Sequence, residues 1–385
     1  MKLVFLSNFF NHVQVSISDA FYELCDKQYY FIETTEVPEE RRKGGFDILE
    51  RPYVIRTWKG PEEDRKAHEV SLEADVLICG SELLSLSYKK ERLSRNKLTF
   101  EYSERWFKRG FINLFSKTNL TDHFYYHTRF KNAPFYKLCS SPYTPNDEYA
   151  MRSFIGKCYK YGYFPKVNEL DIDSVLEAKN PSPVRILWCA RFLGWKHPEM
   201  VVDLAKRLAE TGLDVEINMV GIGGLWEKIQ KSVADNNLGH ILHLVGSAPN
   251  EKVLEMMREH HIFLLTSDRQ EGWGVVVNEA MANGCCVVSS DAVGSVPYLI
   301  EDGVNGRLFR SEDCDSLYKA VYDLVVNRTL REQYTRSAYK TISEDWSPKR
   351  AAANFLELSD CLLNNRQCSI DSGPCSVAVP YRRPR

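Results

Sequence analysis

The chain has 385 residues, which suggests two domains because a single hydrophobic core seldom grows to that size. Apolar residues make up 44% and charged residues 26%, as in a globular protein, and the net charge of −2 provides no overall field for nucleic acid. The opening stretch MKLVFLSNFF has too short an apolar core for a signal peptide or a membrane span, so we expect a first buried strand there.

The eleven cysteines show neither a CxxC pair nor a regular spacing. Several lie within strand-like runs, which favours reduced, buried thiols in a cytosolic protein. The nine histidines and the cysteines do not fall at metal-ligand spacing, so we expect no metal site.

The first half begins with alternating strand and helix patterns, and a basic, aromatic segment follows over 84–133. We predict strands near 2–8, 29–35 and 74–81, with a helix near 15–25.

The second half is more regular, with buried strands alternating with helices of ten or more residues. Such alternation predicts βαβ units around a parallel sheet, and near-continuous apolar strands indicate burial on both faces. The expected strands lie at 184–191, 215–221, 240–246, 261–267 and 285–291, and the expected helices at 197–212, 225–237 and 250–260.

A polar, proline-bearing stretch over 167–183 marks the predicted domain boundary. We expect an N-terminal domain over 1–167 and a C-terminal domain over 168–345. A helix over 346–365 follows, with Ser347 as its N-cap and Pro348 at its first position. The residues 366–385 contain several prolines and little periodicity, and we expect them to be disordered.

The loops that follow the strands of an open α/β sheet share its carboxyl edge, where ligands bind. In this chain those loops carry the cations Arg191 and Lys196, the glycines Gly221 and Gly246, and Ser247. Cations and glycine turns on one edge suggest a nucleotide or phosphate ligand. The alternatives are solvated loop charges and ordinary strand-to-helix turns.

The stretch EGWGVVVNEA (271–280) places two acids eight positions apart around a glycine-broken turn. Gly272 and Gly274 let the backbone approach a ligand, and a helix beginning near Val275 favours an anion at its start. Glu271 and Glu279 are then expected to hold different parts of one elongated ligand. Alternatively they are a capping acid and a surface acid, and Trp273 is more often a packing residue.

The segment 271–309 resembles the donor-binding segment of the group-one retaining glycosyltransferases, which use nucleotide sugars. Their E-x7-E signature is matched by Glu271 and Glu279, and ARFLGWKH (190–197) is similar to their arginine–lysine loop. The resemblance covers about 184–360 and is poor over 1–183. It implies an α/β fold of the GT-B type, in which two Rossmann-like domains face each other across a cleft and the C-terminal helix crosses back to the N-terminal domain.

The resemblance also implies roles for individual residues. Glu271 would face the sugar and Glu279 the ribose, while Arg191 and Lys196 would contact the diphosphate, so that neither a metal nor a cofactor besides the donor is required. The turn from Gly272 through Trp273 and Gly274 to Val275, with Gly221, Gly246 and Ser247, would bind the donor. A histidine of the N-terminal domain commonly lies by the donor sugar in this family; His127 is the first candidate, followed by His12 and His123.

Three other functions stay open. A nucleotide-sugar epimerase would use the same scaffold, and a non-catalytic nucleotide-sugar-binding subunit would support another transferase. A nicotinamide-dependent oxidoreductase is disfavoured because no GxGxxG follows the first strand.

The acceptor is expected to be a glycan or a lipid-linked sugar, since parts of the first half resemble bacterial enzymes of capsule or exopolysaccharide synthesis. The segment 84–133 holds eleven Lys/Arg against four Asp/Glu, interleaved with aromatic residues. This pattern predicts a cytoplasmic protein that binds peripherally to an anionic membrane surface. The alternatives are a solvated basic face and a site for single-stranded nucleic acid, which nothing else in the chain supports.

Overall fold

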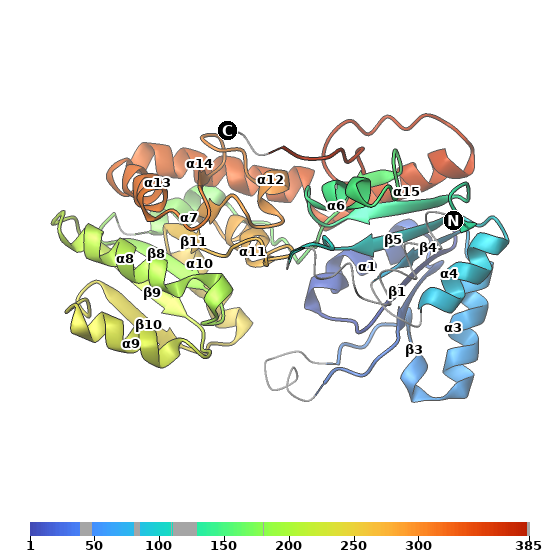
Figure 1. Cartoon of the computed structure of the whole chain (residues 1–385), viewed down its shortest axis with the longest axis horizontal. Helices are drawn as coiled ribbons and strands as arrows, with labels where there is room; N and C mark the ends of the chain where they lie inside the picture. Colours follow the sequence, from blue (N-terminus) through green and yellow to red (C-terminus); the bar gives the residue numbers. More distant parts are fainter. Residues whose placement is uncertain (39–47, 81–84, 109, 111–128, 180, 383–385) are drawn as a thin grey trace. The chain divides into compact units, whose positions relative to one another are not determined.

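The structure is a computed structural model that describes residues 1–38, 48–80, 85–108, 110, 129–179 and 181–382. The chain divides into two compact units, shown in Figure 1. Unit 1 comprises Met1–Lys166 together with Asp345–Arg385, and unit 2 comprises Val167–Glu344. The histidine candidates His123 and His127 lie outside the described residues.

Unit 1 is built on a seven-stranded sheet in which every neighbouring pair is parallel. Its strand order is β3-β2-β1-β4-β5-β6-β7, so the chain starts in the middle of the sheet and extends it in both directions. Apolar residues on the central strands are buried, as expected for a sheet covered on both faces. The strands are β1 (Leu3–Ser7), β2 (Tyr29–Glu33), β3 (Val54–Arg56), β4 (Val76–Cys79), β5 (Thr99–Ser103), β6 (Phe135–Cys139) and β7 (Cys158–Lys160).

The helix predicted over 346–365 is α15 (Pro348–Leu363), which packs in unit 1 against α1 (His12–Leu24). The side-chain oxygen of Ser347 accepts a hydrogen bond from the backbone N–H of Arg350 at 3.2 Å, so Ser347 is the N-cap. The ring of Phe355 is fully buried against Phe21 and Phe100. In the described part of unit 1, the other α-helices are α3 (Pro61–Glu73), α4 (Ser85–Ser94) and α6 (Thr144–Ala150).

The expectation of a disordered tail over 366–385 is wrong for its described part. Residue Val377 forms an antiparallel bridge with Tyr159 of β7, and Cys375 donates its backbone N–H to the carbonyl of Lys160 at 2.7 Å. The side chains of Cys375 and Ala378 are buried. The tail is therefore held by the free edge of β7. Local composition gave no sign of this partner because it lies far away in the sequence.

Unit 2 contains a six-stranded parallel sheet with the order β10-β9-β8-β11-β12-β13. This arrangement confirms the fold class, an α/β chain with two Rossmann-like domains. Every strand predicted in the second half is present, and β13 adds an edge strand. The strands are β8 (Val184–Cys189), β9 (Val215–Val220), β10 (Leu242–Gly246), β11 (Ile262–Leu265), β12 (Cys286–Ser290) and β13 (Arg307–Phe309).

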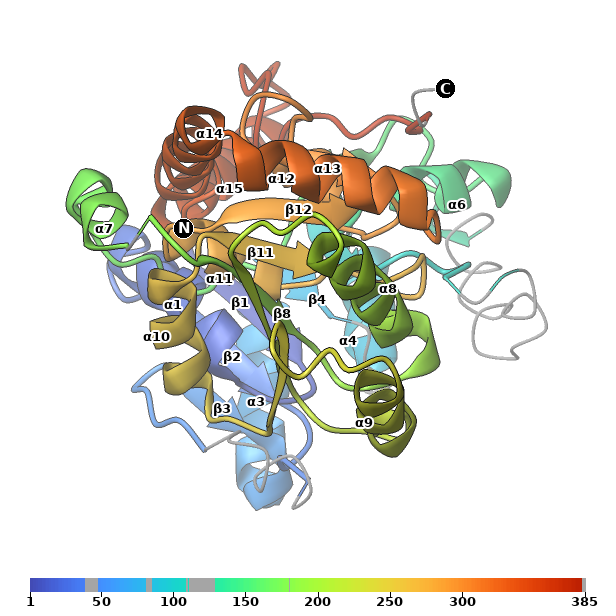
Figure 2. The same cartoon turned by 90° about the vertical axis from the view of Figure 1, so that its left-hand side faces the viewer.

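Helices cover both faces of the unit 2 sheet. In Figure 2, α10 lies on one side of β8, and α8 and α9 lie on the other. Apolar residues of α8, α9 and α13 form one continuous core with the strands they cover. The helices are α8 (Pro198–Ala209), α9 (Trp226–Asp235), α10 (Asn250–Glu259), α11 (Val276–Ala282), α12 (Val296–Leu299), α13 (Cys314–Val326) and α14 (Arg328–Lys340).

The polar stretch 167–183, predicted as the domain boundary, contains a helix, and unit 2 begins at Val167. Helix α7 (Ile172–Ala178) begins at Asp171, whose side chain accepts backbone hydrogen bonds from the first turn. An ion pair of 2.7 Å joins Asp173 to Arg336 of α14, and the hydroxyl of Tyr339 accepts a hydrogen bond from the backbone N–H of Leu170. Polar contacts therefore hold this segment to unit 2.

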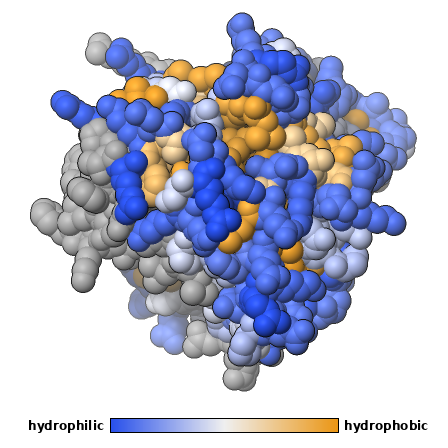
Figure 3. Space-filling view, turned by 90° about the vertical axis from the view of Figure 1, so that its right-hand side faces the viewer, coloured by the Kyte–Doolittle hydropathy of each residue, from blue (hydrophilic) through white to orange (hydrophobic). Residues whose placement is uncertain are grey.

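The basic segment 84–133 is described only in part, and several of its cations serve the interior of unit 1. Arg92 is fully buried and donates to backbone carbonyls, including that of Ser71 at 2.6 Å. Lys89 is buried and pairs with Glu101 at 3.0 Å. These charges cannot face a membrane, so they weaken the predicted anionic-membrane contact. Figure 3 shows hydrophobic groups on one face of the molecule in strips separated by hydrophilic residues.

Among the described residues, we find no helix that combines the length and the apolar composition needed to cross a bilayer. All eleven cysteines are free thiols.

Replacing Phe355 with Ala should destabilise unit 1 by about 3–5 kcal/mol, because a fully buried ring is lost and a cavity is left. Amide hydrogen exchange in α1 and α15 measures this loss locally. The matched control is Lys349→Ala, an exposed position on the same helix, which should change stability by no more than about 0.5 kcal/mol. Equal exchange in both variants would contradict the packing described for α15.

Candidate functional site

The carboxyl edge of the unit 2 sheet has one topological switch point, between β8 and β11. From β8 the chain continues outward to β9 and β10, and from β11 it continues outward in the other direction to β12 and β13. Two loops leave the sheet at this point, 190–197 after β8 (the lysine loop) and 266–274 after β11 (the glutamate loop). A switch point is where open α/β sheets bind ligands.

The structure brings together Lys196 and Glu271, which were predicted as site residues from different motifs. Their side chains form an ion pair, and the Ser267 hydroxyl donates to the same Glu271 oxygen, Oε2, at 3.0 Å. The two side chains are only 11% and 13% exposed. The Lys196 ammonium also lies over the Trp195 ring, 4.3 Å from its centroid. A shielded cation and a shielded carboxylate therefore face each other at the switch point.

Two backbone-directed hydrogen bonds join these loops. The backbone N–H of Asp268 donates to the carbonyl of Trp195 at 3.0 Å, and the hydroxyl of Thr266 donates to the carbonyl of Lys196 at 2.6 Å. The buried indole of Trp188 in turn donates to the Thr266 hydroxyl at 2.9 Å. The core of the sheet thus determines where Lys196 and Glu271 meet.

The glycine-broken turn is buried and fastened to the loop that follows β12. The backbone N–H of Gly294 donates to the carbonyl of Glu271, and that of Ser295 to the carbonyl of Trp273. Gly274 has φ +83°, a conformation that side chains rarely adopt. The Trp273 indole donates to the Asn278 side chain at 2.9 Å and is 2% exposed, so Trp273 has a packing role here.

Glu279 lies in the first turn of α11, four residues after Val275, the N-cap residue of this helix. Burial raises the pKa of the Glu279 carboxyl to about 7, and the hydrogen bond from Asn250 opposes this rise. That bond, from Asn250 Nδ2, is long at 3.5 Å. The surrounding chain therefore stabilises the negative charge of Glu279 only weakly. This is expected for a carboxylate that hydrogen-bonds a ligand.

The glycines Gly221 and Gly246 have a structural explanation. A Cβ on Gly221 would lie 2.0 Å from the carbonyl oxygen of Ala190, so only glycine lets the loop after β9 approach the lysine loop. The backbone N–H of Gly221 donates to the carbonyl of Gly246 at 2.7 Å. Ser247 and Arg191 are exposed beside this contact. Arg191 therefore stands at the carboxyl edge on the same loop as Lys196, with its side chain open to solvent.

Three side chains that the sequence analysis missed converge beside the Lys196–Glu271 pair. His197, Asp268 and Glu312 place one possible ligand atom each within 4.8 Å of one another, so among the described residues this group has the geometry to hold a cation. The imidazole Nδ1 of His197 lies 2.9 Å from a Glu199 carboxylate oxygen, and this contact raises the pKa of His197. His197 directly follows the predicted Lys196 in the sequence, but a single histidine without a spacing pattern did not indicate a site.

Of the predicted histidines, only His12 is described, and it is the first residue of α1 in unit 1. Burial lowers the pKa of its imidazole. The roles predicted for His123 and His127 stay predictions, because both residues lie outside the described chain.

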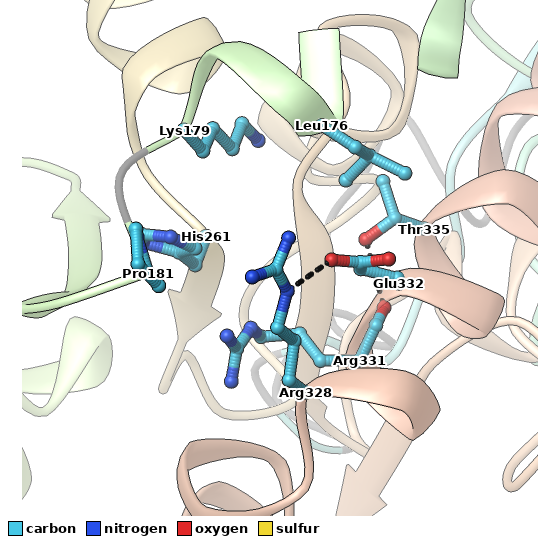
Figure 4. Close-up of a pocket in the computed structure, with 8 residues that line it drawn as sticks. All are labelled: Leu176, Lys179, Pro181, His261, Arg328, Arg331, Glu332 and Thr335. Atoms are coloured by element: carbon cyan, nitrogen blue, oxygen red, sulfur yellow. Dashed lines mark hydrogen bonds and ion pairs between the residues drawn. The ribbon is translucent and has the colours of Figure 1, made fainter. Parts of the chain in front are cut away.

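A small cavity in unit 2 lies at the opposite edge of the sheet, near the amino ends of β8 and β11 (Figure 4). Its volume of about 10 Å³ has room for roughly one water molecule. The cation Lys179 donates to the carbonyl of His260 at 2.7 Å, and Arg331 donates to the carbonyls that end α13. These charges stabilise the fold, so this cavity does not belong to the site at the carboxyl edge.

Comparison with known proteins relates the second half of the chain to a family of glycosyl transferases. Residues 172–341 match the family model described as glycosyl transferases group 1. An uncharacterized glycosyltransferase of Methanocaldococcus jannaschii is 25% identical over 203 residues, which are 52% of this chain and 50% of the relative. The poly(ribitol-phosphate) alpha-N-acetylglucosaminyltransferase of Staphylococcus aureus is 25% identical over 170 residues, 44% of this chain and 34% of the relative. The chain spans about half the length of the first curated relatives that it matches.

Solved structures share the fold over nearly the whole chain. The structure of Anabaena HepE in complex with UDP has a TM-score of 0.68 at 16% identity, covering 92% of this chain and 99% of its own. The apo form of WaaB, a lipopolysaccharide outer core galactosyltransferase, has a TM-score of 0.65 at 16% identity, covering 95% and 99%. At these identities the likeness establishes the fold alone.

Replacing Glu279 with Gln should stabilise the protein more at pH 8 than at pH 5. Between the ordinary pKa of 4.5 and the raised pKa of about 7, the unfolded chain has lost the Glu279 proton while the folded protein keeps it. The folded state then binds more protons, so wild-type stability falls as pH rises through this window, and the neutral amide removes that fall. Urea unfolding at both pH values measures it.

The control for this prediction is Glu251→Gln, an exposed position at the start of α10. A stability difference between Glu279→Gln and wild type that does not change with pH would show that burial does not raise this pKa.

Proposed function

We propose, from the match of residues 172–341 to the group 1 glycosyl transferases, that the protein transfers a sugar from a nucleotide-diphosphate sugar to an acceptor hydroxyl, with retention of anomeric configuration. The observation that carries the proposal is the shielded Lys196–Glu271 pair at the switch point of the unit 2 sheet, with the Glu279 carboxyl on the next helix. The site thus has a cation for a diphosphate and two carboxylates for hydroxyl groups.

In the reaction proposed, the bond between the anomeric carbon and the diphosphate oxygen breaks, and the acceptor oxygen forms a bond to that carbon on the same face. The acceptor proton passes to the departing phosphate. Negative charge grows on the diphosphate as the bond breaks, and Lys196 and Arg191 are the side chains placed to stabilise it. One preorganised donor of this kind typically lowers the barrier by about 3–4 kcal/mol. On this account no metal is required.

The two carboxylates contact different parts of the nucleotide sugar. Glu271, which is held by Lys196 and Ser267, faces the sugar hydroxyls, and Glu279 accepts hydrogen bonds from the ribose. Hydroxyl donors stabilise the ionised form of Glu279, whose pKa burial raises to about 7 in the free protein. Binding of the nucleotide sugar therefore releases a proton from the Glu279 carboxyl at pH values near or below 7. The affinity for the nucleotide sugar consequently rises with pH up to about 7.

We propose a cell-surface glycan or its lipid-linked precursor as the acceptor. Two matched relatives are named for transfer to poly(ribitol-phosphate) and poly(glycerol-phosphate), and a fold neighbour for the lipopolysaccharide outer core. Attachment to an anionic membrane stays a prediction that rests on the cations of 84–133 not engaged inside unit 1.

The decisive experiment is a panel of nucleotide sugars screened for thermal stabilisation and then for transfer, with excess EDTA in one arm. A donor held at 100 times its Kd should add about 2.7 kcal/mol of stability. Transfer should survive the chelator, because Lys196 and Arg191 supply the charge. Consumption of the donor without an acceptor would favour an epimerase, and binding without consumption would favour a non-catalytic subunit.

Substitutions at the two glutamates should have different effects. Glu271→Gln should lower kcat by about 10²–10³-fold while the free nucleotide diphosphate binds almost as before, because the partner of Glu271 is the sugar. Glu279→Gln should instead weaken binding of the free nucleotide. Isothermal titration and steady-state kinetics separate the two effects, with Glu251→Gln as the exposed control. Near-normal turnover by Glu271→Gln would remove its assigned role.

A further inference from the structure

The lysine loop ends on a residue with a left-handed backbone conformation. His197 has φ 50° and ψ 52°, in the left-handed region that glycine adopts readily and other residues rarely do. Glycine would fit this turn without strain. Histidine is among the non-glycine residues found in this region more often than most, so the contacts of the imidazole decide whether the side chain has a use.

The His197 ring spans the gap between the lysine loop and the glutamate loop. Its Nδ1 lies 2.9 Å from Glu199 Oε1, and its Nε2 lies 3.5 Å from Asp268 Oδ2. The ring is 17% exposed and the Asp268 carboxylate 15%. Because Glu199 orients one edge of the ring, the other edge points at Asp268, and Glu312 lies close by from a third loop.

The Asp268 carboxylate is itself oriented by its own loop. Its Oδ1 accepts the backbone N–H of Gln270 at 2.7 Å, and the backbone N–H of Glu271 donates to the carbonyl of Asp268 at 3.1 Å. Asp268 is thus bonded to the turn that leads into Glu271, while His197 directly follows Lys196 in the chain. A contact between these two side chains links the backbones that carry the reactive pair.

We propose that His197 is a positioning residue that, through Asp268, holds Lys196 and Glu271 in the arrangement needed for sugar transfer. The two backbone-directed bonds between the loops tie them at Trp195 and Lys196, and the His197–Asp268 contact is a third tie on the far side of Lys196. Three ties that surround Lys196 limit rotation of its loop, which two adjacent bonds alone would permit. This inference rests on the proposed transferase function.

The test compares His197→Gly, His197→Asn, Asp268→Asn and the His197→Gly/Asp268→Asn double variant with wild type. Glycine removes the ring but suits the left-handed backbone, so the fold should be as stable as wild type or more so. Asparagine tolerates the same conformation and keeps a side chain able to hydrogen-bond Asp268. Asp268→Asn keeps the bond to Gln270 and loses the charge. His243→Ala, at an exposed position on β10, is the control.

We expect kcat to fall about 10-fold in His197→Gly and less in His197→Asn, with the donor KM within about 2-fold of wild type. The double variant should be no worse than the worse single variant, because both changes break the same contact. The variant with the lowest kcat is then not the least stable one. A purely structural role for His197 would instead make kcat fall together with stability. Wild-type kcat in His197→Gly would overturn the proposal.

Hydrogen exchange gives a readout that needs no turnover. The amides of Asp268 and Glu271 should exchange at least about 10-fold faster in His197→Gly than in wild type, while amides of α9 stay unchanged. If wild type transfers no sugar from any donor, the proposed function fails, and exchange alone decides whether the contact holds the loops. Unchanged exchange overturns the proposal. Slower exchange in wild type on adding Mn²⁺ or Zn²⁺, absent in His197→Gly, would also overturn it, because the imidazole would then serve a metal.

Discussion

The parallel pairing of β8 with β11 is the constraint on which the candidate site depends. Ile186, Leu187 and Trp188 pair with Ile262, Phe263 and Leu264, all of them fully buried. This pairing joins two strands that are separated in the chain by two other strands, β9 and β10, and three α-helices, α8, α9 and α10. Because parallel strands end at the same edge, the loops that follow β8 and β11 must leave the sheet side by side. The meeting of Lys196 with Glu271 is therefore a consequence of core packing.

The packing beneath the site also determines its chemistry. Trp188, in the buried core of the sheet, donates to Thr266, which donates to the carbonyl of Lys196. A chain of hydrogen bonds thus runs from the core to the reactive loop, and it leaves the Lys196 ammonium and the Glu271 carboxylate shielded from water but in contact with each other. Charges in such a place interact more strongly than charges on the surface.

Unit 1 meets a different constraint, because charged side chains lie within its core. Lys137 is fully buried and pairs with Glu101 at 2.8 Å and with Glu148 at 3.0 Å, while Glu101 also pairs with Lys89. A buried charge is tolerated when it is paired, and removing one partner is costly. Pairing of this kind explains why Lys89, which belongs to a segment that looked like a basic surface in the sequence, lies inside unit 1. Charge counted along the chain does not tell which face a side chain occupies.

The sequence by itself determined the periodic elements of unit 2 and the carboxyl-edge loops, because alternating strand and helix patterns and a glycine-broken turn are local signals. It also singled out Lys196, Glu271 and Glu279 as candidate site residues. The Ser347 cap and the helix that follows it were local signals too. Only the tertiary structure decided that the tail after 366 pairs with β7, that Arg92 and Lys89 are buried, and that Gly221 serves a close backbone approach. It alone brought His197 to Asp268. Each of these depends on a partner remote in sequence, and neither composition nor spacing carries information about a contact whose two halves lie on different elements.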